Sequence, residues 1–295
     1  MIGIATFLAV ILGSASGNAA EVALLSEPNL ILDQIAQGFK ATFPGPVESF
    51  TLNPQSEEAF WQRVKQSYPK LIVALGPAAA AQAKERFAPE IPVLFAGVVG
   101  AQLSKLEGER VEGIPMTLPV KEQWASAQKA LPDLKRMGVL YSPQDSREKF
   151  SEARDAARAL SIELVAAPCA TPEALSEALS RIEGRVDALW IPLDPVVANK
   201  LAFKGLVSFS LKNRLPLIVP SISLLRGGGL LSLSMSYQEI GKQLGLQAQA
   251  ILSGGSARVR LSASDADVAV NMNTAKALGR DFPAEFMKTV KIKVE

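Results

Sequence analysis

The chain has 295 residues, of which 48% are hydrophobic and 20% are charged, and its formal net charge is +2. This length allows two domains with proper cores, and the composition excludes a disordered chain and gives no support to nucleic-acid binding. The chain has no histidine, which removes the commonest general base and zinc ligand, and its one cysteine, Cys169, excludes an internal disulfide. We therefore expect no catalytic residues, no metal site and no cofactor. Cys169 follows an apolar run, and we expect a buried structural thiol rather than a reactive one.

The N-terminus has the pattern of a secretory signal peptide. Residues 1–12 are almost wholly apolar, and residues 13–20 are small and weakly polar. Such a stretch is too short to span a membrane, so we expect a cleaved signal peptide at 1–20 and a periplasmic mature protein that starts near Glu21. No lysine or arginine precedes the apolar stretch, which leaves open either a true start codon that lies earlier or an atypical signal. A buried first strand is the alternative interpretation, although residues 21–25 already provide one.

The first third of the mature chain alternates apolar runs with amphipathic segments. We expect strands at 22–25, 47–52, 71–75 and 91–96, with helices at 30–43, 57–67 and 78–87. Strands that are apolar on both faces belong in a parallel sheet covered by helices. A polar loop follows at 104–112, and the chain then crosses into a second unit near 113–116.

A second unit repeats the pattern of apolar run, helix and apolar run. The run 71–77, its helix and the run 91–97 have a counterpart in the run 187–195, a helix at 196–212 and the run 215–221. We also expect strands at 137–141, 162–166, 230–235 and 267–271, and helices at 120–131, 146–160, 172–182, 240–252 and 274–278. The expected fold class is therefore α/β, with two doubly wound parallel-sheet lobes joined by a hinge.

The chain is expected to cross between these lobes three times. The first crossing lies near 113–116, and the return crossings lie near 235–237 and 261–268. The first lobe then contains residues 21–115 plus about 236–262, and the second contains 116–235 plus about 263–295.

The candidate ligand-binding residues follow from the topology, because open parallel sheets bind ligands beyond the carboxyl ends of their strands. The residues that follow the predicted strands, together with one at the first crossing, are Ser26, Glu27, Gly76, Pro77, Gly97, Met116, Ser142, Asp145, Ser146, Asp194 and Ser221. The first-lobe members are small or offer their backbone, whereas the second lobe supplies hydroxyls and carboxylates.

Two interpretations stay open for the carboxylates in this set. Asp194 directly follows an apolar strand and precedes Pro195, so it can pair with a ligand ammonium group or cap the helix that follows. Asp145 and Ser146 stand where a helix begins, and the free N–H groups of a helix N-terminus suit a ligand carboxylate as well as a cap. No nucleotide-binding glycine pattern and no nucleophile motif occurs.

The order and spacing of these segments resemble one known family. The resemblance covers nearly the whole mature chain and includes segments 71–76, 91–96, 111–114, 131–143, 187–194, 237–241 and 270–276. The chain resembles the substrate-binding proteins of ABC transporters with the type I periplasmic-binding fold, in particular the family that includes tryptophan- and tyrosine-binding members. In that family the aspartate that Asp194 resembles faces the ligand in amino-acid binders.

Three segments depart from the family pattern. Gly97-Val98-Val99-Gly100 stands where an Asp-Pro-Val-like turn is usual, and Gly76-Pro77 stands in place of Gly-Thr. The loop that holds an amino-acid carboxylate in the family is shorter and more acidic here, at 143–146. The resemblance thus implies the fold more strongly than it implies an aromatic amino acid as the ligand.

The resemblance implies a monomeric periplasmic receptor that closes on a small molecule and delivers it to an ABC permease in the inner membrane. The alternative is a sensory module that presents its ligand to a membrane receptor or kinase; neighbouring permease and ATPase genes would favour transport. A hydrolase or transferase is disfavoured because histidine and nucleophile motifs are absent.

Overall fold

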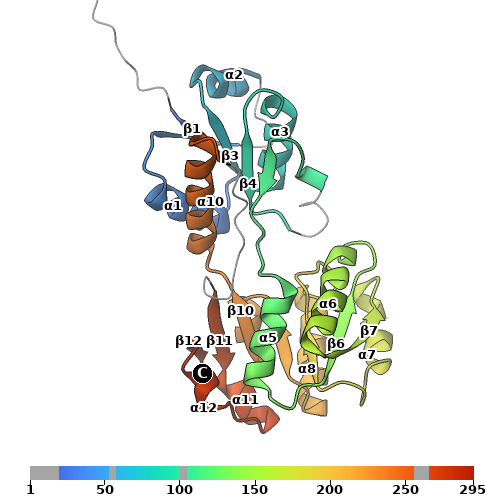
Figure 1. Cartoon of the computed structure of the whole chain (residues 1–295). Coiled ribbons are helices and arrows are strands. Elements are labelled where there is room, and N and C mark those ends of the chain that lie inside the picture. Colours follow the sequence, from blue (N-terminus) through green and yellow to red (C-terminus); the bar gives the residue numbers. More distant parts are fainter. Residues whose placement is uncertain (1–19, 53–57, 100–104, 256–265) are drawn as a thin grey trace, which may run out of the picture.

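The computed structural model describes residues 20–52, 58–99, 105–255 and 266–295, and this part of the chain forms two α/β lobes (Figure 1). The signal peptide predicted at 1–20 lies almost entirely outside the described residues, as does most of the return crossing predicted at 261–268. Of the helices in the described ranges, none combines the length and the apolar character that a membrane crossing requires.

The first lobe is built on a sheet whose described strands are all parallel, in the order β2-β1-β3-β4-β5. The strands are β1 (Val22–Ser26), β2 (Val47–Thr51), β3 (Leu71–Leu75), β4 (Val93–Ala96) and β5 (Val111–Gly113). Helices α1 (Leu30–Thr42) and α10 (Tyr237–Leu252) cover one face, and α2 (Glu58–Gln66) and α3 (Pro77–Phe87) cover the other. The fully buried β3, with no polar side chain, shows why this sheet needs helices on both faces.

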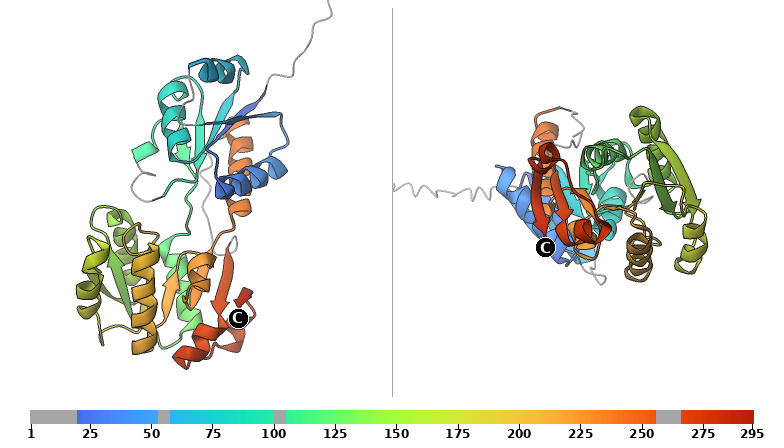
Figure 2. Two further views of the ribbon diagram at one scale, coloured as in Figure 1. Left: turned by 180° about the vertical axis from the view of Figure 1, so that it is seen from behind. Right: turned by 90° about the horizontal axis from the view of Figure 1, so that it is seen from below.

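Helix α10 comes from late in the chain and yet packs along α1 in the first lobe, as both views of the ribbon show (Figures 1 and 2). Glycines permit this close approach. A Cβ atom on Gly241 would lie 2.0 Å from the carbonyl oxygen of Ile35, and one on Gly38 would lie 2.1 Å from that of Gln238. Only hydrogen atoms fit between the two backbones at these points.

The second lobe contains a larger sheet in the order β12-β11-β10-β9-β8-β6-β7. Its strands are β6 (Arg136–Tyr141), β7 (Glu163–Pro168), β8 (Ala188–Trp190), β9 (Leu217–Val219), β10 (Leu231–Ser234), β11 (Asp267–Asn271) and β12 (Val290–Val294). Helices α5 (Val120–Ala130) and α6 (Arg147–Leu160) pack on one face. The short η1 (Pro172–Ala174), with α7 (Leu175–Ser180), α8 (Lys200–Asn213) and α9 (Ile222–Arg226), lies on the other face. Helices α11 (Met272–Leu278) and α12 (Ala284–Met287) follow β11.

One strand pair departs from the all-parallel sheets that we predicted. Strand β11 runs antiparallel to β10, with Leu231 opposite Val270. The reason is the path of the chain: it leaves the second lobe after β10, forms α10 in the first lobe, and returns. A strand that re-enters from the side of the other lobe runs away from it, opposite to β10.

Several elements differ locally from the prediction. The helix expected at 196–212 begins only at Lys200, because Asn199 caps it: its Oδ1 accepts hydrogen bonds from the N–H groups of Leu201 and Ala202, both at 2.9 Å. Helix α9, which Ser221 caps, helix α12 and the edge strand β12 were not predicted, and β5 overlaps the segment that was predicted as a polar loop.

The two lobes share a strand order, since β7-β6-β8-β9-β10 repeats the order β2-β1-β3-β4-β5. In each lobe the order reverses between two strands, β1 and β3 in the first and β6 and β8 in the second. Doubly wound sheets bind ligands at the carboxyl ends of the strands next to such a reversal. The links that join β5 to α5 (114–119) and β10 to α10 (235–236) leave from the same edges. The exact bounds of the lobes stay a prediction.

An ion pair between Asp187 and Arg136 lies at the amino-terminal ends of β8 and β6, and we expect it to make the stability of the fold depend on pH. Asp187 accepts hydrogen bonds from Arg136 Nη2 at 2.7 Å and from the backbone N–H groups of Arg136 and Lys135 at 2.8 and 3.0 Å. Burial by itself raises the pKa of Asp187, but the hydrogen bonds from the Arg136 side chain and from the two amides outweigh it and lower the pKa below its usual value.

A carboxyl group whose pKa is lower in the folded state stabilises the fold above its unfolded pKa, and this contribution is lost as the pH falls through the folded pKa. We expect Asp187→Asn to lower the free energy of unfolding by about 1–2 kcal/mol at pH 7, and the deficit to shrink below about pH 4. Urea denaturation of both proteins between pH 3 and 7 measures this. A deficit of constant size across that range would contradict the assignment. Asp133→Asn, which removes a more exposed pair with Arg280, serves as the control.

Candidate functional site

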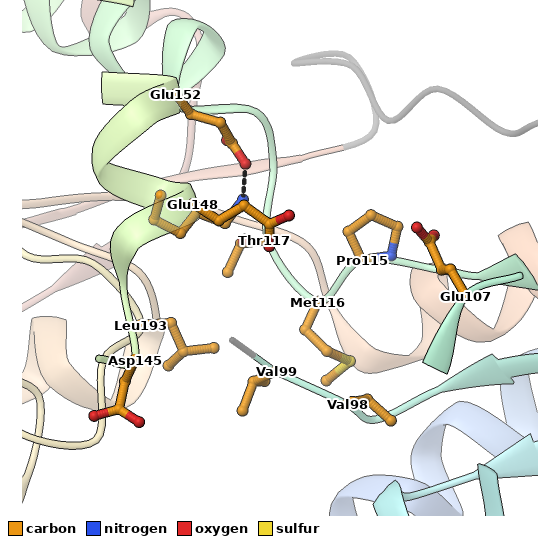
Figure 3. A pocket seen from close by; sticks show the side chains of 11 residues that line it. Val98, Val99, Glu107, Pro115, Met116, Thr117, Asp145, Glu148, Glu152 and Leu193 are labelled. Atoms are coloured by element: carbon orange, nitrogen blue, oxygen red, sulfur yellow. Dashed lines mark hydrogen bonds and ion pairs between the residues drawn. The ribbon is translucent and has the colours of Figure 1, made fainter. Parts of the chain in front are cut away.

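A cavity of about 170 Å³ lies between the two lobes. Its walls come from the segment after β4, from residue 107, from the link 114–119, from the first turns of α6 and from the segment after β8 (Figure 3). The lining residues are Val98, Val99, Glu107, Pro115, Met116, Thr117, Asp145, Glu148, Lys149, Glu152 and Leu193. Because both lobes and a link contribute walls, the cavity changes if the lobes move relative to each other.

Apolar and charged side chains occupy different parts of this cavity. Val98, Val99, Met116 and Leu193 lie near one another, while the charged side chains of α6 lie to one side of them (Figure 3). Such an apolar surface with a few charged groups is the usual composition of a small-molecule site.

A second cavity of about 440 Å³ shares Met116 and Leu193 with the first. It is lined by hydroxyl groups, one arginine, one aspartate and one glutamine in addition to apolar residues. Its lining residues are Gln34, Met116, Leu193, Pro220, Ser221, Ile222, Ser223, Arg226, Ser234, Met235, Ser236, Tyr237, Asp267 and Ile292. The two cavities are therefore neighbouring parts of one space between the lobes.

Asp194 lies beneath this space rather than in it, and only 1% of its surface is exposed. One carboxylate oxygen accepts from the backbone N–H groups of Val196 and Val197 at 2.7 and 3.1 Å. The other accepts from the N–H of Ser142 at 2.8 Å and from the hydroxyl of Ser146. A carboxylate has about four acceptor positions, so the protein's own donors use all of them. Asp194 thereby joins the loops after β6 and β8 where the strand order reverses.

Glu27 has the equivalent role in the first lobe. Its Oε1 accepts hydrogen bonds from the N–H groups of Ala78 and Ala79, at 2.7 and 3.1 Å, and so caps α3 from the loop after β1. Gly76 has φ +100°, and a Cβ there would lie 2.4 Å from Glu27 Oε1, so the turn admits only glycine. In each lobe, a carboxylate therefore links the loops that follow the two strands between which the strand order reverses.

The structure brings together only part of the predicted site set. Met116 and Asp145 line the first cavity, and Met116 and Ser221 line the second. Ser142, Ser146 and Asp194 are buried. The remaining members line neither cavity: Ser26, Glu27, Gly76, Pro77 and Gly97. Direct ligand contact by any of these residues stays a prediction.

Sequence reasoning missed most of the cavity lining. Glu148, Lys149 and Glu152 follow Asp145 at the i+3, i+4 and i+7 spacing of one helix face, and this periodicity could have identified them. Glu107 follows no strand, and nothing in its local sequence marks it as part of the site.

The predicted buried thiol is confirmed, since Cys169 has no exposed surface. Burial raises the pKa of the thiol, and the negative charges of Asp194 and Glu173 raise it further, which makes the reactive thiolate scarce. Within the described ranges, no group of three or more acidic, cysteine or histidine side chains is placed to hold a metal ion.

Comparison with known proteins gives one family and one named relative. The family model described as ABC transporter substrate binding protein matches residues 51–291. A tyrosine-binding protein of Clostridioides difficile (strain R20291) is 25% identical over 209 residues, which are 68% of this chain and 60% of that relative. The alignment therefore spans less than two thirds of the relative's length.

Solved structures of similar fold cover nearly the whole chain. A ligand-free, open substrate-binding protein with adhesive properties from Clostridium difficile has a TM-score of 0.70 at 21% identity, covering 94% of this chain and 100% of its own. An ABC domain in complex with L-Trp from Streptococcus pneumonia has a TM-score of 0.64 at 20% identity, with coverage of 93% and 99%. At such identities the likeness shows the fold alone, and it confirms the predicted class of two α/β lobes joined by a hinge.

Proposed function

Since the chain belongs to the family of ABC transporter substrate-binding proteins, we propose that it is a solute receptor that closes its lobes on a small molecule and delivers it to an ABC permease. The space between the lobes carries this proposal, because its walls come from both lobes and from the link 114–119. A ligand that contacts both lobes stabilises the closed arrangement over the open one.

The same proposal includes export of the protein. A signal peptide at 1–20 would be removed, and the monomeric receptor would act in the periplasm beside the permease of the inner membrane. The matched family and the tyrosine-binding relative are binding proteins by description, which supports a receptor without catalytic activity.

The proposed ligand site is the interlobe space between the predicted strand-end residues. Met116, Asp145 and Ser221 would face the ligand, because they line the two cavities. Asp194 and Glu27 would hold the loops in place, because their hydrogen bonds go to protein donors.

Native mass spectrometry of the protein purified from its own host tests the proposal. We expect a small molecule to co-purify, and its removal and re-addition to change the radius of gyration in solution scattering as the lobes close. Val99→Arg, which places a long charged side chain in the first cavity, should abolish co-purification.

Leu246→Arg is the matched control, because Val99 and Leu246 are both 45% exposed and Leu246, on α10, lines neither cavity. Equal ligand retention by the two variants would contradict the site. Absence of any bound small molecule in the parent, with no change in its scattering on screening, would contradict the receptor function.

A further inference from the structure

The first interlobe cavity is strongly acidic. Glu107, Asp145, Glu148 and Glu152 contribute four carboxylates and Lys149 one ammonium group, a formal charge of −3. The Lys149 ammonium group already forms an ion pair within the cavity wall, because its Nζ lies 2.7 Å from Glu152 Oε1. The Lys84 ammonium group donates a hydrogen bond to the backbone carbonyl of Glu107 at 3.4 Å and offsets part of the negative charge of the cavity. In the described part of the chain, no lysine or arginine forms an ion pair with Asp145 or Glu148.

Two of the positions that would bind an anion at these sheet edges are filled by carboxylates of the protein itself. Backbone N–H groups at helix N-termini and strand-order reversals are the usual anion sites of this architecture. In the first lobe, the carboxylate of Glu27 accepts hydrogen bonds from the backbone N–H groups of Ala78 and Ala79. In the second lobe Asp194 occupies those of Val196 and Val197. The N-terminus of α6 has no side-chain cap, but Asp145 and Glu148 flank its first turn with negative charge.

Two arginines of the second lobe line other surfaces than the first cavity. Arg226 lines the second cavity and not the first. Arg147, although it begins α6, lines a separate groove beside Tyr141. An α-amino acid, whose ammonium and carboxylate are joined through one carbon atom, would place its carboxylate in the acidic cavity together with its ammonium group.

We propose that the ligand is a small organic amine that has no carboxylate group. The inference rests on the proposed receptor function and assigns the ligand class of the same site. The ammonium group lies against the acidic wall at Glu148, and the apolar part of the ligand packs on Val98, Val99, Met116 and Leu193. The −3 cavity attracts a cation and repels a carboxylate, and its small volume with apolar walls suits a ligand with one charged end.

Two pairs of compounds test this ligand class by titration calorimetry. Tyramine and tyrosine differ only in the carboxylate, as do tryptamine and tryptophan. We expect the amine of at least one pair to bind, and to bind at least about tenfold more tightly than its amino acid. If tyrosine or tryptophan binds as tightly as its amine, or if none of the four compounds binds, the amine assignment is wrong. The receptor function is tested separately, by identifying the compound that co-purifies with the protein. Binding of tyrosine would contradict the amine assignment but would still support the receptor function.

A charge-neutral variant tests the role of the acidic side chains. Glu148→Gln should weaken the amine about three- to tenfold and leave the amino acid unchanged or tighter, because only the electrostatic attraction is removed. Glu163→Gln, at a carboxylate on β7 that is also exposed but lies outside the cavity, should change neither affinity. A loss of affinity that is the same for the amine and the amino acid would indicate a structural effect and overturn the electrostatic assignment.

Discussion

Replacing Asp194 with alanine is expected to lower the free energy of unfolding by about 3–5 kcal/mol and to abolish ligand binding. The side chain is 1% exposed and accepts four hydrogen bonds, three of them from backbone N–H groups. Without the carboxylate these donors stay buried without an acceptor, and each such donor costs about 1–3 kcal/mol before local rearrangement. The loops after β6 and β8 would then lose the group that joins them.

Urea denaturation and ligand titration of Asp194→Ala measure both effects. Asp145→Asn is the control for stability, because Asp145 is exposed and its hydrogen bonds stay within its own loop, to Ser142. An unchanged unfolding midpoint for Asp194→Ala would contradict the structural role.

The more conservative Asp194→Asn separates the two roles that we considered for this residue. The amide group presents a donor where the carboxylate accepted, so we expect an intermediate loss of stability, about 2 kcal/mol, with a parallel loss of binding. A variant that keeps full stability yet binds more than tenfold more weakly would instead support direct contact between Asp194 and the ligand.

A second large effect is expected where helices α1 and α10 meet. In Gly241→Ala the new Cβ atom would lie 2.0 Å from the carbonyl oxygen of Ile35 and 2.7 Å from the nitrogen of Phe39. Backbone atoms cannot rotate away as a flexible side chain does, so the two helices must separate along a buried interface. We expect the free energy of unfolding to fall by about 3 kcal/mol or more, at the upper end of the range for overpacking.

Thermal and urea unfolding of Gly241→Ala check this expectation against Gly108→Ala. A Cβ on Gly108 meets only Lys84 Nζ, at 3.8 Å, so that substitution should be nearly neutral. If both variants unfold together with the parent, the close helix contact described here is absent in solution.

The sequence predicted the lobes well because their signal is local. Strand β3 and its counterpart β8 are continuous apolar runs that are fully buried, and each is followed by a turn and a helix. Burial on both sheet faces demands this pattern whatever the rest of the chain does. The direction of β11 gave no such signal, because three apolar residues between Asp267 and Asn271 are compatible with a parallel and with an antiparallel pair.

The candidate site was likewise predicted where its signal is local and missed where it depends on distant residues. That Asp194 and Asp145 stand at the carboxyl edge of the second sheet follows from their places after apolar strands, and the sequence alone determined this. Which of them meets the ligand space depends on partners far away in the chain. The carboxylate of Asp194 accepts hydrogen bonds from donors that include Ser142 and Ser146, some fifty residues earlier in the chain. Asp145, in contrast, lines the cavity.

The sequence by itself therefore determined the fold class, the repeated unit and the sheet edge at which a ligand is expected, because apolar periodicity and turn residues act over a few neighbours. Only the tertiary structure decided that α10 returns to pack on α1, that Glu27 and Asp194 cap backbone N–H groups, and that Glu148 and Glu152 make the cavity acidic. These properties depend on distances between residues remote in the chain. Such distances are set by the packing of the two lobes as a whole.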